Sequence, residues 1–312
     1  HRLQTGLDVW QREIRSDRKR ELRNGAVVRD IPLPNASYLS VGAFAEDRWT
    51  VSERLRVHGG LRVDAIQVEN DPTPQWKERD EDEMSWNAHA GVAFDLTTAL
   101  SAELLVARGY RAASLEERYA YLDLAGGRVK RGDPALDPEE SNFVEAGLQW
   151  TSERVRLSTA AFYNDLDNLI AEQVADASTI VNANVKQAEI YGLEAAAELE
   201  PGAGVTLYAN AAWLKGEDKN SGEPLPGIAP LKGLLGGRFD GPRGGWSTVE
   251  LVMAAEQDET PDGVESTAGW QRLDLRVGVD LDGRRARHRL YGGVDNVLDQ
   301  VYNRYLVTSR GF

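Results

Sequence analysis

The residues best suited to bind a ligand are concentrated in one long polar stretch, residues 111–139. It contains arginine, lysine and tyrosine side chains close together: Arg111, Arg118, Tyr119, Tyr121, Arg128 and Lys130. Arginine pairs with anionic groups through a planar fork of donors, and tyrosine offers a flat amphipathic surface. These side chains could contact an anionic molecule, although a charge-rich stretch can also be simply a solvated loop.

Metal binding has weak support in the sequence. The histidines are His1, His58, His89 and His288, and none is spaced from another as metal ligands usually are. His58 and His89 could face the same side from neighbouring strands, but polar residues are expected on that side in any case. We therefore predict no metal site and no cofactor.

Catalysis also has weak support. A hydrolase needs a nucleophile and a base that converge on one face. Asp64 and His58 share a face, but they are six residues apart in sequence, which is about 20 Å along a strand. We therefore predict no catalytic residue, and the protein is not expected to be an enzyme.

The candidate residues lie within or beside segments in which apolar and polar residues alternate. In residues 273–281 every odd position is apolar and every even position is charged or glycine. Successive side chains of a strand point to opposite faces, so this segment predicts a strand with one apolar and one polar face. A helical period would scatter the charges around the axis. With a turn at 282–285 and a second strand, the segment predicts a hairpin.

The same pattern recurs along the chain and predicts about thirteen strands. They are residues 1–14, 37–51, 55–68, 86–95, 100–110, 142–150, 155–163, 188–199, 205–213, 230–239, 246–257 and the two strands of the hairpin. Between them, long loops alternate with short turns at 52–54, 97–99, 151–154, 201–204, 241–245 and 282–285. We expect the short turns to share one end, as the periplasmic turns of bacterial outer-membrane barrels do. The predicted fold is all-β, an antiparallel transmembrane β-barrel of the bacterial outer membrane.

Composition agrees with this fold class. The net charge is −14 over 312 residues, which makes nucleic acid an unexpected partner. Mean hydropathy is −0.46 and no apolar run suits a membrane helix, but barrel strands alternate and also look soluble on average. The chain has no cysteine, which excludes disulfides and suits an oxidising envelope. Four tryptophans fall on the apolar face near predicted strand ends, where an aromatic girdle belongs: Trp49, Trp86, Trp150 and Trp213.

An odd number of strands cannot close an antiparallel ring, and an open edge cannot face lipid. We therefore expect residues 1–312 to be part of a barrel that lacks at least one closing strand. The tail, residues 301–312, ends in Arg310, Gly311 and Phe312 with no alternating strand before them. It is interpreted as a loop cut short.

Five segments, in order along the chain, resemble TonB-dependent outer-membrane receptors. Residues 293–306 (GVDNVLDQVYNRYL) resemble the penultimate-strand signature Gly-x-x-Asn-Leu-Phe/Leu-Asp-x-x-Tyr. Residues 107–119 (ARGYRAASLEERY) resemble the Arg-Gly-Phe-Arg-Ala-Pro-x-Leu-x-Glu-Leu-Tyr box, with Ala113 where proline is usual. Residues 132–150 resemble the Asn-Pro-x-Leu-x-Pro-Glu box and its following strand, and residues 182–198 and 42–64 resemble two further strands of the family.

The resemblance implies a 22-stranded barrel with a plugged lumen. It places roughly eight further strands, the N-terminal plug and the segment that binds TonB upstream of residue 1. The implied function is uptake of a scarce ligand, with energy supplied by the TonB complex of the inner membrane through the plug. Outer-membrane lipid and lipopolysaccharide would contact the wall. Loop 111–139 then becomes a candidate for ligand capture, through Arg111, Arg118, Tyr119 and Tyr121.

The ligand class is left partly open. Haem receptors of this family usually carry a histidine between the two boxes, and this chain has none between residues 111 and 132. Haem is therefore disfavoured, while ferric siderophores, similar metal chelates and cobalamin-like ligands remain candidates. A passive outer-membrane pore or an adhesin is the alternative, whereas a soluble propeller is disfavoured because no repeated motif is present.

The alternation of residues 100–110 also predicts side-chain directions at the start of the loop. It places Arg111 on the lumen face and Tyr110 on the outer face, at the upper girdle. The loop side chains themselves are expected to be solvated and to contribute little to packing.

Overall fold

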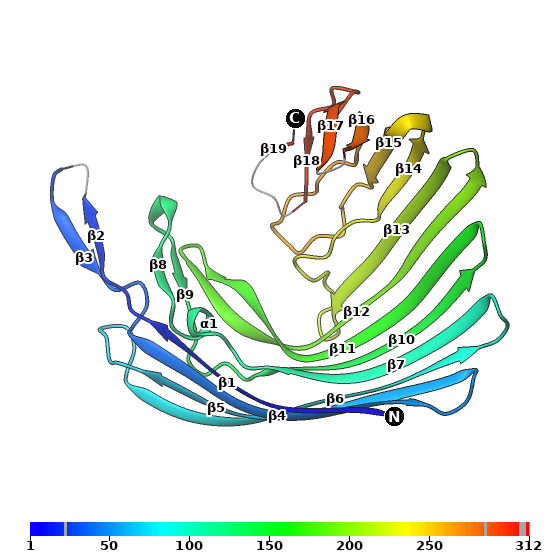
Figure 1. The fold of residues 1–312 in the computed structure, drawn as a ribbon. Helices are drawn as coiled ribbons and strands as arrows, with labels where there is room; N and C mark the ends of the chain where they lie inside the picture. The colour runs from blue at the N-terminus through cyan, green and yellow to red at the C-terminus, as the bar shows by residue number, and fades with distance from the viewer. Residues whose placement is uncertain (22–23, 284–285, 306–309, 312) are drawn as a thin grey trace. The chain divides into compact units, whose positions relative to one another are not determined.

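The computed structural model describes residues 1–21, 24–283, 286–305 and 310–311. In this part of the chain, thirteen strands lie side by side in one sheet in the order in which they occur in the sequence (Figure 1). Their number equals the number that the alternation predicts, and the predicted all-β antiparallel fold is confirmed. They are β1 (Arg2–Ile14), β4 (Ala36–Thr50), β5 (Leu55–Asn70), β6 (Arg79–Asp95), β7 (Leu100–Arg111), β10 (Glu139–Thr151), β11 (Val155–Asp176), β12 (Thr179–Gly202), β13 (Val205–Asp218), β14 (Lys232–Asp240), β15 (Gly245–Ala254), β16 (Trp270–Asp282) and β17 (Arg287–Val294).

Shorter elements lie in the connections. They are β2 (Arg18–Glu21), β3 (Val27–Asp30), α1 (Leu115–Tyr119), β8 (Tyr121–Asp123), η1 (Ala125–Gly127), β9 (Val129–Arg131), η2 (Pro242–Gly244), β18 (Tyr302–Asn303) and β19 (Arg310–Gly311). Within the described residues, no helix is long and apolar enough to cross a membrane.

The chain divides into two compact units. Unit 1 comprises His1–Val92, Leu105–Phe143 and Asp165–Ala188, and unit 2 comprises Ala93–Leu104, Val144–Asn164 and Glu189–Phe312. Several long strands contribute residues to both units, among them β7, β10, β11 and β12.

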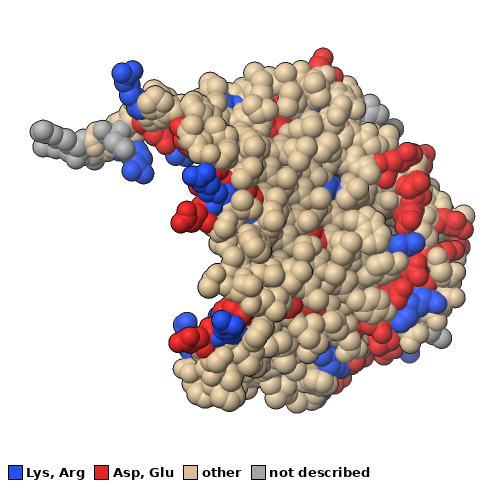
Figure 2. All heavy atoms as spheres, turned by 90° about the vertical axis from the view of Figure 1, so that its right-hand side faces the viewer, with Lys and Arg blue, Asp and Glu red and all other residues tan. Residues whose placement is uncertain are grey.

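In unit 2 the alternation of β16 separates the two faces of the sheet as predicted. Val277 is 61% exposed and Leu275 and Leu281 are also exposed, whereas Asp274 is 1% exposed. The register keeps apolar residues together across strands, because Leu275 of β16 lies opposite Val249 of β15. The odd residues therefore form an apolar face. The face shown in Figure 2 carries few charged side chains over its centre, and most of its charges lie toward its margins.

The opposite face of β16 is polar and its charges are paired. Asp274 accepts a hydrogen bond from the backbone N–H of Asn296 at 2.9 Å and forms an ion pair with Arg272 at 2.8 Å. Arg276 donates to Glu250 at 3.1 Å and to Asp295 at 2.8 Å. The predicted orientation of Asp274 and Arg276 away from the apolar face is confirmed.

Hydrogen bonds between neighbouring turns show that the short turns of unit 2 share one end of its strands. The N–H of Thr151 donates to Ala99 at 2.7 Å, the N–H of Glu200 to Arg154 at 2.8 Å, and the N–H of Asp240 to Gly204 at 2.7 Å. The two-residue turn between β12 and β13 has positive φ at both central positions, 55° at Ala203 and 77° at Gly204, as a type I′ turn requires.

Two of the predicted turns stand apart from this result. The turn at 52–54 belongs to unit 1, and its common end with the others stays a prediction. The predicted turn at 282–285 includes residues 284 and 285, which lie outside the described residues. Next to them, the N–H of Gly283 donates to Ala286 at 2.9 Å.

The connections are more ordered than the alternation predicts. The predicted loop between residues 163 and 188 is wrong, because β11 continues to Asp176 and β12 begins at Thr179. Only two residues separate these strands, and the N–H of Ser178 donates to the Asp176 carboxylate at 2.7 Å. Beyond the hydrocarbon layer a strand needs no apolar face, so backbone pairing persists while the alternation that reveals it is lost.

The two faces of β16 give a direct test. Val277→Arg should lower the free energy of unfolding by about 2–4 kcal/mol, because the substitution places a charge on the lipid-facing side of a barrel strand. The control Val264→Arg lies in an exposed connection and should cost less than about 0.5 kcal/mol. Urea unfolding of the two variants in lipid vesicles measures both values. Equal costs would show that Val277 does not face hydrocarbon.

Candidate functional site

The stretch 111–139 is folded rather than extended into solvent. Ser114 caps α1 in unit 1 through a capping box, in which its side chain accepts from the N–H of Glu117 at 3.2 Å and the Glu117 carboxylate accepts from the N–H of Ser114 at 2.8 Å. β8 and β9 then form a small antiparallel pair. β9 also pairs in parallel with the start of β12, with Val129 opposite Thr179. The loop is therefore joined to the extended β11–β12 hairpin (Figure 1).

An apolar cluster holds the loop on the polar face of the sheet. Leu115 and Tyr119 of α1 are buried against Ile66 and Val68 of β5, together with Ala36 and Trp76. The indole N–H of Trp76 donates to the backbone carbonyl of Tyr119 at 2.9 Å. Ile66 and Val68 lie on the same face of β5 as Arg62 and Asp64, and most residues on this face are polar. These two apolar residues on a polar face are the sequence signal that something covers this part of β5.

Arg118 is the buried charge of the loop. Its side chain is 1% exposed, and its guanidinium forms ion pairs with Glu81 at 2.8 Å and with Glu83. The Tyr110 hydroxyl donates to the same Glu83 carboxylate at 2.9 Å. The expectation that the loop side chains are solvated is therefore wrong for Arg118 and Tyr119. Sequence alone missed this because Glu81 and Glu83 are more than thirty positions away.

Tyr110 also departs from its predicted direction. Its backbone N–H donates to the Asn87 side chain at 2.7 Å, and its own side chain packs against the apolar cluster beneath α1. Tyr110 and Arg111 both line one pocket, and the predicted outward placement of Tyr110 is wrong.

Arg111 and Tyr121 are more accessible than their two neighbours in the loop. The Arg111 guanidinium donates to both oxygens of Glu139 at 2.6 Å and to Glu117 at 2.8 Å, and the side chain remains 46% exposed. Tyr121 is half-buried, and its backbone N–H donates to Pro32 at 2.8 Å. Of the four predicted ligand residues, the structure thus leaves two accessible and buries Arg118 and Tyr119.

A pocket of about 400 Å³ lies beside Arg111 on the polar face of unit 1. The Trp10 and Tyr38 rings stack in it with centroids 4.9 Å apart. Arginines from β1, β5 and β7 border it, and each is paired with a carboxylate. The lining residues are Trp10, Arg12, Tyr38, Ser40, Arg62, Asp64, Ile66, Ser85, Asn87, Tyr110, Arg111, Ala112, Ser114 and Leu115.

The pocket combines two kinds of recognition. The stacked rings offer flat apolar contact. Each guanidinium of Arg12, Arg62 and Arg111 keeps at least one N–H donor beyond those that bind its carboxylate partners, which are Glu116 for Arg12, Asp64 and Asp8 for Arg62, and Glu139 and Glu117 for Arg111. A guanidinium can therefore hydrogen-bond to an anionic or carbonyl oxygen that enters the pocket. Such an arrangement can bind a small polar molecule.

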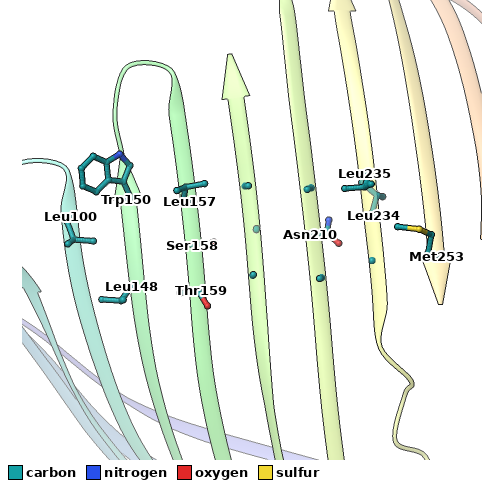
Figure 3. A pocket seen from close by; sticks show the side chains of 16 residues that line it. Leu100, Leu148, Trp150, Leu157, Ser158, Thr159, Asn210, Leu234, Leu235 and Met253 are labelled. Atoms are coloured by element: carbon teal, nitrogen blue, oxygen red, sulfur yellow. The ribbon is translucent and has the colours of Figure 1, made fainter. Parts of the chain in front are cut away.

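Another hollow, of about 540 Å³, lies on the apolar face of unit 2 and differs in chemistry. Alanine and glycine on β12, β13 and β14 form its floor, and Trp150, Leu157 and Leu235 stand around them (Figure 3). None of the described residues that line it carries a charge. It suits hydrocarbon rather than a polar ligand, so the polar pocket of unit 1 is the better candidate for a functional site.

The carboxyl group of Glu117 connects the loop helix with the pocket. Burial would raise its pKa, but the hydrogen bonds from Arg111 and from the backbone and hydroxyl of Ser114 outweigh burial and hold the pKa below its usual value. The ionised form of Glu117 is therefore favoured in the folded loop. It supports the N-terminus of α1 and the position of Arg111 together.

A sheet with one apolar face, one ion-paired polar face and an inward-folded loop is the wall of a membrane β-barrel. The family description "TonB dependent receptor-like, beta-barrel" matches residues 1–297, and the chain belongs to this family. It is accordingly a bacterial outer-membrane protein of a family of receptors rather than enzymes.

Three known proteins show the similarity of this chain in fold or in sequence. The copper transporter OprC is 20% identical, with a TM-score of 0.83 over 97% of this chain and 49% of its own. The ferric yersiniabactin uptake receptor FyuA from Yersinia pestis is 17% identical, with a TM-score of 0.68 over 99% of this chain and 48% of its own. The heme/hemopexin utilization protein C of Haemophilus influenzae (strain 86-028NP) is 25% identical over 62% of this chain and 31% of its own length. The chain thus spans half or less of these proteins.

Arg118→Ala should destabilise the loop strongly. It leaves Glu81 and Glu83 without their buried partner, and breaking a buried ion pair from one side costs about 3–5 kcal/mol. Hydrogen exchange of β8 and β9 should accelerate accordingly. The control Arg15→Ala removes an arginine that is 81% exposed and should leave exchange unchanged. Unchanged protection in both variants would mean that Arg118 does not anchor the loop.

The depressed pKa of Glu117 predicts an acid-sensitive loop. Its contribution to stability should be complete above the unfolded-state pKa of about 4.3 and should be lost as the pH falls from there through the lower folded pKa. Hydrogen exchange of α1, corrected for intrinsic rates, should show this loss in the parent protein. Glu117→Gln should show less of it, and Glu153→Gln in an exposed turn should behave like the parent. A pH profile that is the same in Glu117→Gln and the parent would contradict the assignment.

Proposed function

We propose that the chain forms part of the barrel wall of a TonB-dependent transporter that takes up a scarce metal chelate, such as a ferric siderophore, or a cobalamin-like ligand. Residues outside this chain would supply the plug and its contact with the TonB complex. Family membership supports this function, and so does the chain's coverage of about half of two similar solved receptors. The observation that carries it is the folded loop with an arginine- and aromatic-lined pocket beside it.

Within this function, the roles of the loop residues divide by exposure. Arg111 and Tyr121 are the proposed ligand contacts, because both keep accessible surface and Arg111 borders the pocket. Arg118 and Tyr119 are proposed to hold the loop in place, since both are loop residues whose side chains are buried. A ligand with anionic oxygens and flat apolar groups would match the chemistry of the pocket.

Binding measurements on the full-length receptor test the contact residues. Arg111→Ala combined with Tyr121→Ala should weaken binding of the recognised chelate about tenfold to a hundredfold, because one charge-assisted hydrogen bond is worth about 1.5–3 kcal/mol. A panel of ferric siderophores and cobalamin identifies that ligand by titration. Arg154→Ala in an exposed short turn is the matched control and should bind like the parent. Unchanged affinity in the double variant would remove both residues from the site.

Uptake by cells separates the transporter from the alternative of a passive pore or adhesin. Accumulation of the bound chelate should require both this receptor and TonB, because the energy is proposed to arrive through the plug. Accumulation that persists in cells lacking TonB would support a pore. Binding to surfaces without accumulation would support an adhesin.

A further inference from the structure

Two histidine rings lie together on the polar face of unit 1, and neither of them lines the pocket beside Arg111. His58 on β5 and His89 on β6 have ring centroids 5.7 Å apart, and their planes are tilted by 52°. Both side chains are half-buried. In the described part of the chain, no hydrogen bond joins either ring to another residue, so their ring nitrogens remain available to a ligand.

Glycines on the opposing strands create the space for both rings. A Cβ at Gly91 would lie 2.3 Å from Nε2 of His58, and a Cβ at Gly60 would lie 2.6 Å from Cε1 of His89. Each ring therefore lies across the glycine of the neighbouring strand. This reciprocal arrangement keeps both imidazoles close to the sheet and close to each other, which two long side chains pointing into solvent would not achieve.

The surroundings leave room for further ligands beside the two rings. Arg48 lies opposite His58 in the register of β4 and β5, and its guanidinium donates to Glu46 at 3.0 Å. Among the residues that the structure describes, no group of three or more histidine and carboxylate side chains stands together. Any ion held by the two rings would therefore keep positions for water or for donors of another molecule.

We propose that His58 and His89 form a two-histidine site for a divalent transition-metal ion of the Cu²⁺, Ni²⁺ and Zn²⁺ class. An imidazole nitrogen binds such an ion at about 2.0–2.1 Å, so two rings that share one ion have centroids roughly 5–6 Å apart. The observed 5.7 Å falls in this range. Imidazole suits these ions, and Cu²⁺ is bound most tightly of them, whereas Ca²⁺ and Mg²⁺ prefer oxygen ligands.

The site is distinct from the function proposed above and does not depend on it. Chelate capture uses the loop and the pocket beside it, whereas this site would bind the metal ion itself through side chains of β5 and β6. The sequence allowed His58 and His89 to face the same side from neighbouring strands but favoured no metal site, because polar residues are expected on that side in any case. The contact between their rings became evident only from the fold.

Titration of the purified full-length receptor with CuCl₂ tests the proposal. His58→Ala combined with His89→Ala should weaken Cu²⁺ binding at least about tenfold. Electron paramagnetic resonance should show two coupled imidazole nitrogens in the parent and one in each single variant. His288→Ala, which removes a histidine from β17, is the matched control and should keep both the affinity and the spectrum of the parent.

Two further variants keep both histidines and disturb only their positions. Gly60→Ala and Gly91→Ala should each reduce Cu²⁺ affinity, because the added methyl group displaces the ring that lies across it. Binding of the chelate should be unchanged in all of these variants, which separates failure of this site from failure of the transporter proposal. Cu²⁺ affinity and spectra that are unchanged in the double histidine variant would overturn the proposal, as would parent-like binding in both glycine variants.

Discussion

Backbone hydrogen bonding is the constraint on which the rest of the structure depends. Hydrocarbon offers no water to satisfy an N–H or C=O group, so a chain that crosses it as strands must pair each strand with its neighbours. The sheet order follows the chain order for this reason, and short turns join successive strands. The same constraint fixes the alternation of side chains, with apolar residues such as Val277 on one face and paired charges such as Asp274 on the other.

The polar face holds the candidate site because its side chains do not have to be apolar. There the chain can hold a buried ion pair, as Arg118 does with Glu81 and Glu83, and can fold a loop against Ile66 and Val68. The pocket beside Arg111 results from this folding, since α1 supplies one side of it and the strands supply the other. The candidate site is therefore a product of the loop's packing rather than of the strands alone.

Sequence predicted the strands well and the loops poorly, for a physical reason. Lipid imposes a two-residue period on β16, and this period is visible in the printed sequence. No such period marks the upper parts of β11 and β12, where both faces meet water, so their pairing was missed. Arg118 looked like a ligand residue because its partners are distant in sequence. His58 and His89 could be placed on the same side of neighbouring strands, but the contact between their rings depends on a strand register that the sequence does not show. The alternation within a segment predicts a strand and its two faces. Burial of a side chain and contacts between strands can be seen only in the folded structure.

The parallel pairing of β9 with β12 has a consequence for how this receptor can change over time. It joins two surface segments that are far apart in sequence, since Val129 lies opposite Thr179. Surface loops usually tolerate insertions and deletions, but here a shift of register in one segment removes backbone partners from the other. The two segments are therefore expected to evolve as a pair, with length changes in one accompanied by changes in the other. Diversification of the mouth would then be freer at the β2–β3 hairpin, which forms its own separate sheet.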